Sequence, residues 1–180
     1  MKQIHEWDVR CSKRIQAWFS GRRGPAYIDK WHKWFWEQAS AKGASVYAVV
    51  MLGLLFLLRD HRVFIWLIPV AVTAVLTILL QAIIQRPRPR RGETKTHYKP
   101  ILPTYSFPSN HAASSFAFAT SLSYAFASSS LSVIWPFIML FFFLAVVISL
   151  SRIVVGVHYC LDVLAGAMFG MSVTILLFGL

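Results

Sequence analysis

One short stretch of this 180-residue chain places three ionisable side chains where an apolar, membrane-like sequence would otherwise continue. Residues 151–162 read Ser-Arg-Ile-Val-Val-Gly-Val-His-Tyr-Cys-Leu-Asp and contain Arg152, His158 and Asp162. Ionisable groups at membrane depth are costly and usually mark a functional site. On a helix, residues four apart share a face, so Asp162 could hold one nitrogen of His158 and leave the other free as a nucleophile or base. Arg152 suits a phosphate oxyanion. A buried polar cluster that only joins two helices is the alternative for this stretch alone.

Two further polar motifs precede this stretch. Residues 86–91 read Arg-Pro-Arg-Pro-Arg-Arg, and the prolines stop a helix and favour an extended backbone. Residues 108–111 read Pro-Ser-Asn-His. Ser109 and Asn110 fall where a long uncharged run begins, and the free N–H groups at the start of a helix favour an anion.

The composition is that of a membrane protein. Hydrophobic residues make up 57% of the chain and charged residues only 14%, whereas about a quarter of the residues of a soluble domain are charged. Nine of the eighteen Lys and Arg lie before residue 43, and six lie between Arg86 and Lys99. In a membrane protein such clusters indicate headgroup contacts, topology signals or phosphate ligands, and we expect no nucleic-acid partner despite the net charge of +11. No disulfide is expected between Cys11 and Cys160, which lie in very different settings.

The apolar runs predict an all-α fold, a multi-pass transmembrane helical bundle of about five spans. The predicted spans are residues 43–58, 63–84, 109–127, 131–150 and 157–180. Residues 1–42 are aromatic and basic, and their spacing predicts N-terminal interfacial amphipathic helices, with helices packed on the bundle as the alternative. The apolar residues at helical spacing are Ile4, Trp7, Cys11, Ile15, Trp18 and Phe19. The chain is therefore expected to divide into an interfacial region, 1–42, and a transmembrane domain, 43–180.

With five spans, the loops after the second and fourth spans lie on the same side of the membrane. The polar groups that would meet there are Arg86, Arg88, Ser109, Asn110, His111, Arg152, His158 and Asp162. Several arginines, a helix N-terminus and two histidines fit phosphoryl transfer better than metal binding, since a zinc site needs three or four His, Cys or carboxylate ligands. We therefore expect no metal and no cofactor.

The three motifs resemble the signature of the type 2 phosphatidic acid phosphatase family, which consists of integral membrane phosphatases. Its pattern is Lys, six residues, Arg-Pro; then Pro-Ser-Gly-His; then Ser-Arg, five residues, His, three residues, Asp. Residues 151–162 match the third motif fully, and the second is matched with Asn110 in the Gly position. The first is matched at Arg88, with Gln81 in the Lys position. Gln81 can still donate a hydrogen bond to phosphate but brings no charge, and Arg86 is a candidate to compensate. The resemblance covers about residues 43–175.

The resemblance implies a lipid phosphatase in which His158 attacks phosphorus to form a phosphohistidine. It implies that Asp162 holds the ring of His158 and that His111 protonates the leaving group and then activates water. The implied phosphate ligands are Arg88, Arg152, Ser109 and the amide of Asn110, with Gln81 and Arg86 as further candidates. The implied substrates are undecaprenyl diphosphate, phosphatidylglycerophosphate, phosphatidate and lipid A 1-phosphate, and the sequence does not rank them. An anion-binding transporter and a non-catalytic membrane scaffold are the alternatives.

Charge and family resemblance point to opposite faces of the membrane. Five spans place sixteen Lys and Arg on the side of the polar motifs and only Arg59 and Arg62 on the other. The positive-inside rule would face the site to the cytoplasm. Many bacterial relatives have the site facing the periplasm, and on that resemblance we expect a bacterial inner-membrane protein with a periplasmic site. The expected partners are a lipid phosphate substrate and the bilayer, and the oligomeric state is left open.

Overall fold

The computed structural model describes residues 2–19, 34–40, 42, 49, 53, 63–89, 105–126 and 134–179. Within these residues all regular secondary structure is helical, which confirms the predicted all-α class. The helices are α1 (Lys2–Phe19), α3 (Val63–Ile84), α4 (Asn110–Phe126), α5 (Ile134–Val154) and α6 (Cys160–Gly179), with a short helical stretch at residues 34–40. The span predicted at residues 43–58 lies outside the described residues, except for residues 49 and 53, which are helical.

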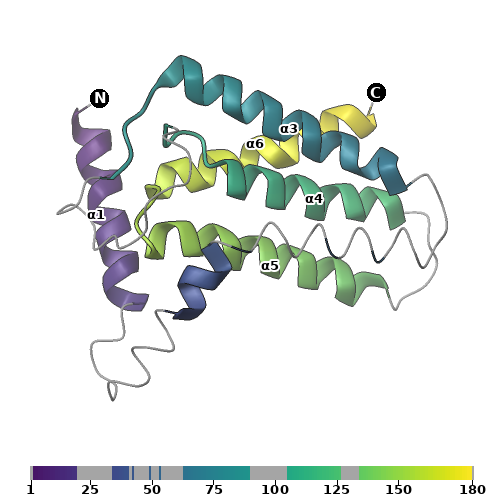
Figure 1. Ribbon diagram of the computed structural model, residues 1–180, viewed down its shortest axis with the longest axis horizontal. Helices are drawn as coiled ribbons and strands as arrows, with labels where there is room; N and C mark the ends of the chain where they lie inside the picture. The colour runs from purple at the N-terminus through teal and green to yellow at the C-terminus, as the bar shows by residue number, and fades with distance from the viewer. Residues whose placement is uncertain are drawn as a thin grey trace.

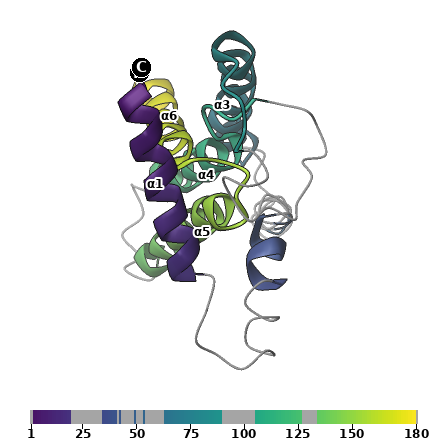
Figure 2. The same ribbon diagram turned by 90° about the vertical axis from the view of Figure 1, so that its left-hand side faces the viewer.

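Helices α3, α4, α5 and α6 form a bundle with α4 at its centre, where it contacts the other three (Figure 2). The centre is built from small residues, and most of α4 is buried. Gly166 and Gly170 of α6 face α4 directly. A Cβ atom added to Gly166 would lie 2.5 Å from the backbone oxygen of Ser109, and one added to Gly170 would lie 2.0 Å from that of Ala113. Small residues at these positions let the two backbones approach closely, as is common between membrane helices.

Within the described parts of the chain, three helices are long and apolar enough to cross a membrane, over Ile65–Ile84, Trp135–Val154 and Cys160–Gly179. Each of these segments has 20 residues, and at about 1.5 Å per residue this length matches the ~30 Å hydrocarbon core of a bilayer. Their outer faces expose large apolar side chains, among them Ile78, Phe143 and Met168. Such a surface suits lipid tails, and the chain is a membrane protein.

The connection between α5 and α6 differs from the sequence expectation. Helix α5 continues to Val154 and α6 begins only at Cys160. Arg152 therefore lies in the last turn of α5, and His158 lies in the connection rather than on α6. The expectation that His158 and Asp162 share the face of one helix is wrong.

A glycine ends α5 and creates this connection. Gly156 adopts the left-handed conformation, with φ of 78°. Its N–H donates to the carbonyl of Ile153 at 2.9 Å, and the N–H of Val157 donates to that of Arg152 at 3.1 Å. This pair of hydrogen bonds around a left-handed glycine is the Schellman arrangement that closes many helices.

Helix α1 crosses one end of the bundle, where α3 ends and α4 and α6 begin (Figure 1). It caps α6 from outside. The N–H of Cys160 donates to Ser12 Oγ at 3.0 Å, and the N–H of Leu161 donates to Asp8 Oδ1 at 2.9 Å. The first N–H groups of a helix have no partner within that helix. Two side chains of α1 therefore satisfy the start of α6.

The apolar residues predicted for α1 divide between the bundle and its surroundings. Cys11, Ile15 and Phe19 pack against buried residues of the bundle, whereas Ile4, Trp7 and Trp18 are at least half exposed. Asp8 and Ser12 are completely buried as well, because they supply the hydrogen-bond acceptors that the start of α6 needs. The exposed aromatic and aliphatic side chains of α1 remain available to the surroundings of the bundle.

Candidate active site

Polar residues from four segments meet at the end of the bundle that α1 crosses. They come from the end of α3 and the residues that follow it, from the start of α4, from the last turn of α5, and from the connection before α6 together with the first turn of α6. All the site residues predicted from the sequence lie within the described parts of the chain: Gln81, Arg86, Arg88, Ser109, Asn110, His111, Arg152, His158 and Asp162. The structure brings them to one end of the bundle, and the contacts below show how each is held.

His158 is buried with its two ring nitrogens in different surroundings. Nδ1 lies 2.8 Å from the backbone carbonyl oxygen of Ser106. A carbonyl can only accept, so Nδ1 carries the proton and Nε2 keeps its lone pair. Nε2 lies 3.5 Å from Nη1 of Arg88. Burial lowers the pKa of His158; Asp162 opposes this shift, and the positive charges of Arg152 and Arg88 add to it. The neutral ring therefore presents an unprotonated Nε2 toward an arginine.

Asp162 is close to His158 but does not make the ring's short hydrogen bond. Its Oδ2 lies 3.8 Å from Nδ1 of His158, which is too long for a hydrogen bond. The same oxygen accepts from the N–H of Tyr159 at 2.9 Å, and Oδ1 accepts from Nη1 of Arg86 at 2.6 Å. Asp162 thus fixes the start of α6 and the arginine after α3, while the carbonyl of Ser106 holds the imidazole.

Arg86, expected as a possible phosphate ligand, lies between two carboxylates. Its guanidinium donates to Asp8 Oδ2 at 2.7 Å and to Asp162 Oδ1 at 2.6 Å. It also stacks over the ring of Tyr159, 4.5 Å from the ring centre. Burial opposes the charge of Arg86, but the two carboxylates together raise its pKa. Burial lowers the pKa of Arg88, and the negative charge of Asp162 opposes this shift.

The second motif places a buried serine hydroxyl just before α4 begins. The backbone N–H of Ser109 donates to the carbonyl of Asp162 at 2.8 Å. Ser109 Oγ is buried and has no hydrogen-bond partner among the described residues. Gln81 donates its side-chain N–H to the carbonyl of Pro108 at 2.7 Å. The side chain of Gln81 therefore supports the backbone next to Ser109.

His111 lies in the first turn of α4, next to Asn110, the first residue of that helix. It is half-buried, and the positive charges of Arg152 and Arg88 lie close enough to act on it. The backbone N–H groups in this first turn have no partner within the helix. Both histidines therefore lie in the same positively charged surroundings.

Arg152 is buried and anchored by a residue from the short helical stretch at 34–40. Its Nη1 donates to the backbone oxygen of Ser40 at 2.8 Å and also contacts Ser40 Oγ. In the same region Trp36 packs against Val155 and Val157 of the α5–α6 connection. Residues before the transmembrane domain thus hold both Arg152 and the segment that carries His158.

The sequence reasoning missed the residues that support the predicted site. These are Asp8, Ser12, Ser40, Ser106 and Tyr159. Ser106 acts through its backbone carbonyl, which has no signature in the sequence. Asp8 and Ser12 act on groups far away along the chain, and nothing in the sequence distinguishes Asp8 from Glu6 on the same helix.

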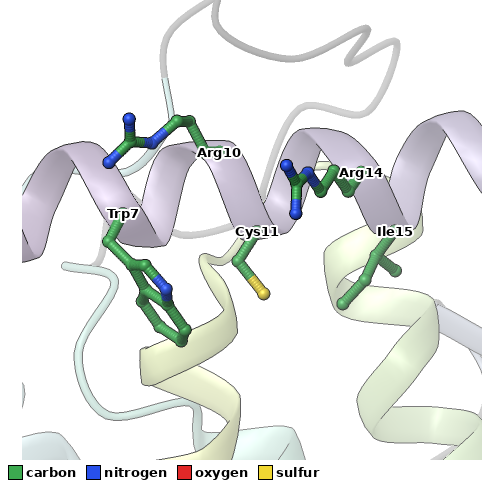
Figure 3. Close-up of a pocket in the computed structure, with 5 residues that line it drawn as sticks. All are labelled: Trp7, Arg10, Cys11, Arg14 and Ile15. Atoms are coloured by element: carbon green, nitrogen blue, oxygen red, sulfur yellow. The ribbon is translucent and has the colours of Figure 1, made fainter.

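A cavity of about 340 Å³ lies along α1, lined by Trp7, Arg10, Cys11, Arg14 and Ile15 (Figure 3). The predicted site residues are not among those that line it. Within the described residues, no three His, Cys, Asp or Glu side chains lie together in a way that could hold a metal ion. Metal independence stays a prediction.

The outer surface of the bundle suits lipid tails, and arginines and histidines cluster at one end of it. These features define a helical membrane protein with a positively charged polar site. Residues 62–180 match the PAP2 superfamily, and the chain belongs to that superfamily. A comparison with curated proteins found no match.

Two solved structures share the fold. One is the first transmembrane PAP2 type phosphatidylglycerolphosphate phosphatase from Bacillus subtilis, with a TM-score of 0.69 and 18% sequence identity; the match covers 99% of this chain and 86% of that one. The other is Aquifex aeolicus LpxE, with a TM-score of 0.69 and 25% identity; the match covers 93% of this chain and 94% of that one.

Proposed function

We propose that this chain is a membrane lipid phosphatase, a hydrolase that removes phosphate from a lipid phosphate or diphosphate through a phosphohistidine on His158. The observation that carries this proposal is the orientation of His158. Its Nδ1 is held by the carbonyl of Ser106, and its unprotonated Nε2 points toward Arg88. Membership of the PAP2 superfamily and the phosphatase named among the similar structures support the same reaction.

In the first step Nε2 of His158 attacks phosphorus. A nitrogen–phosphorus bond forms as the bond from phosphorus to the lipid oxygen breaks, and His111 gives a proton to that oxygen. For a diphosphate substrate the departing group is the lipid monophosphate. Arg88, Arg152 and the hydroxyl of Ser109 stabilise the negative charge on the phosphoryl oxygens as it shifts in the transition state.

In the second step His111, now neutral, takes a proton from water. The water oxygen attacks phosphorus, the nitrogen–phosphorus bond breaks, and its electron pair returns to Nε2 of His158. Inorganic phosphate leaves, and both histidines are restored. Each nucleophile enters opposite the group it displaces. A site that keeps the phosphoryl group in a fixed position therefore serves both steps.

The two departures from the family pattern have proposed roles of their own. Gln81 supports the carbonyl of Pro108 and so keeps Ser109 in place for the phosphate. Arg86 compensates for the missing lysine indirectly, because it neutralises Asp8 and Asp162 instead of contacting phosphate. The N–H of Asn110 supplies a further donor at the start of α4.

The apolar outer surface around the site favours a phosphate that is still attached to its lipid. The candidates are undecaprenyl diphosphate, phosphatidylglycerophosphate, phosphatidate and lipid A 1-phosphate. We place the enzyme in a bacterial inner membrane with the site on the periplasmic side, and its chemistry is metal-independent because arginines and a helix terminus neutralise the phosphate.

Phosphate release from these four lipids tests the proposal directly. Purified protein in mixed micelles should release inorganic phosphate from at least one of them, retain this activity in EDTA, and lose it with vanadate, which mimics pentacovalent phosphorus. Activity that disappears in EDTA and returns with Mg²⁺ would contradict the metal-free mechanism. Transport of phosphate across the membrane of proteoliposomes without lipid hydrolysis would favour the transporter. Absence of both hydrolysis and transport would favour the scaffold.

A further inference from the structure

Asp8 is a completely buried carboxylate on α1, far in sequence from the three motifs that form the site. Its Oδ1 accepts the N–H of Leu161 at 2.9 Å, and its Oδ2 accepts from Nη2 of Arg86 at 2.7 Å. A buried charge of this kind is retained only with such partners. Asp8 therefore belongs to a defined polar network at the end of the bundle.

The network leads from Asp8 to the proposed nucleophile in three steps. Arg86 contacts both Asp8 and Asp162 with two different nitrogens. Asp162 in turn lies 3.8 Å from the ring of His158. One guanidinium is shared by two carboxylates, so the charge of Asp8 determines where Arg86 sits and how strongly it pulls on Asp162.

Neighbouring residues of α1 hold both ends of the segment that carries His158. Gln16 donates to the carbonyl of Ile153 at 2.7 Å, near the end of α5. Ser12 accepts from the N–H of Cys160 at the start of α6. Asp8, Ser12 and Gln16 follow one another at intervals of four, on one face of α1. This face fits the backbone on either side of the connection between α5 and α6.

We propose that Asp8 is a positioning residue for the reaction, which acts through Arg86 and Asp162 to fix the backbone at Tyr159 and so keeps the adjacent His158 in line for attack. This inference rests on the proposed function. It assigns α1 to the catalytic machinery and gives the first arginine of the Arg-Pro-Arg-Pro motif a partner outside the motifs. A displacement of about 1 Å in a reacting group can lower a rate by about 100-fold, so loss of this support should act on the rate rather than on substrate binding.

A double-mutant cycle on the full-length protein tests the proposal. The variants are Asp8→Asn, which keeps the size and an acceptor for Leu161 but removes the charge, Arg86→Gln, and the two together. Glu6→Gln is the matched control, because Glu6 is an exposed carboxylate on the same helix. The measurements are kcat, KM, the rate of phosphoenzyme formation and the thermal midpoint, each per folded protein.

Asp8→Asn should lower kcat and the rate of phosphoenzyme formation by about tenfold or more and leave KM nearly unchanged. The double variant should lose no more kcat than Arg86→Gln alone, because both changes break the same network. Glu6→Gln should behave like the wild type. If the wild type is active and Asp8→Asn has an unchanged kcat, this inference is wrong and the proposed function stands. The same holds if the losses of the two single variants multiply in the double variant. A wild type that releases no phosphate from any of the four lipids would remove the proposed function and this inference with it.

Discussion

His158 is oriented by a backbone carbonyl, and this changes what its neighbouring carboxylate is expected to contribute. The carbonyl of Ser106 fixes the proton on Nδ1. Asp162 contributes charge and holds Tyr159 and Arg86. The tautomer of the proposed nucleophile is therefore independent of the carboxylate, in contrast to sites where an aspartate alone holds the ring.

Asp162→Asn should therefore lose less activity than His158→Ala. We expect a loss of about 100-fold for Asp162→Asn, because the ring keeps its tautomer but loses a nearby negative charge. His158→Ala should lose about a millionfold, since the nucleophile itself is gone. The measurement is phosphate release per folded protein. Equal losses in the two variants would show that Asp162, rather than Ser106, holds the ring.

Gln81 offers a second test at the scale of single residues. Gln81→Leu removes the donor to the carbonyl of Pro108 and should lower kcat/KM by about tenfold, the cost of one lost hydrogen bond to a buried group. Gln81→Lys keeps a donor and adds a charge near Ser109, so it should retain or raise activity. Equal kcat/KM values in the wild type and both variants would mean that this side chain does not influence the phosphate site.

The residues of the three motifs were predictable because their chemistry is in their side chains and their spacing is fixed. Ser106 was not, because its contribution comes from a backbone oxygen. Asp8 and Ser12 were not, because their partners are N–H groups about 150 positions away along the chain. Only the folded chain shows that the start of α6 takes its caps from α1.

Among the helices, the close packing of α4 against α6 positions the residues of the proposed phosphate site. Gly170→Ala would place a methyl group 2.0 Å from the carbonyl oxygen of Ala113. Alanine gains about 1 kcal/mol over glycine in helix propensity, but relief of this overlap should cost about 1–3 kcal/mol. The helices must separate, so we expect a lower thermal midpoint for Gly170→Ala.

Gly166→Ala should also reduce activity, because its new methyl group would meet the backbone oxygen of Ser109. The control is Gly179→Ala, on the same helix, where no atom lies within 4 Å of the added Cβ. Thermal midpoint and phosphate release should be normal for this control. If Gly166→Ala matched the control in both measurements, the close contact between α4 and α6 would not be needed for the site.

Helix boundaries were predictable where composition alone sets them. Helix α3 coincides with the predicted span, because an uncharged run ends shortly before a proline-rich segment. The boundary between α5 and α6 was not predictable in the same way. A glycine within an apolar run does not by itself reveal whether it continues a helix or ends it, and here Gly156 ends α5.

For the whole molecule, the position of α1 across the end of the bundle is consistent with a helix that lies along the membrane surface while it supports the site. Its exposed Trp7 and Trp18 are of the type that favours the membrane–water interface. The division into an interfacial region, residues 1–42, and a transmembrane domain, residues 43–180, stays a prediction. The hydrogen bonds of Asp8 and Ser12 show that the two regions work as one structure.

The side of the membrane can be tested with a cysteine at position 96, in the polar part of the sequence that precedes the second motif. Thr96→Cys, in a Cys11→Ala and Cys160→Ala background that retains phosphatase activity, should react with an impermeant maleimide in intact spheroplasts. The same background without the new cysteine is the control. Labelling only after lysis would place the site in the cytoplasm, as the positive-inside rule suggests.

The most direct test of the central claim is to trap the phosphoryl group on His158. Wild-type protein is mixed with lipid phosphate labelled with ³²P at the terminal phosphorus, quenched within one turnover, and digested to locate the label. The label is expected on the peptide that carries His158 and is expected to be absent from His158→Ala. Acid should release it and base should not, as a nitrogen–phosphorus bond requires. A His158→Ala variant that still turns over substrate, or a label on any other residue, would contradict this mechanism.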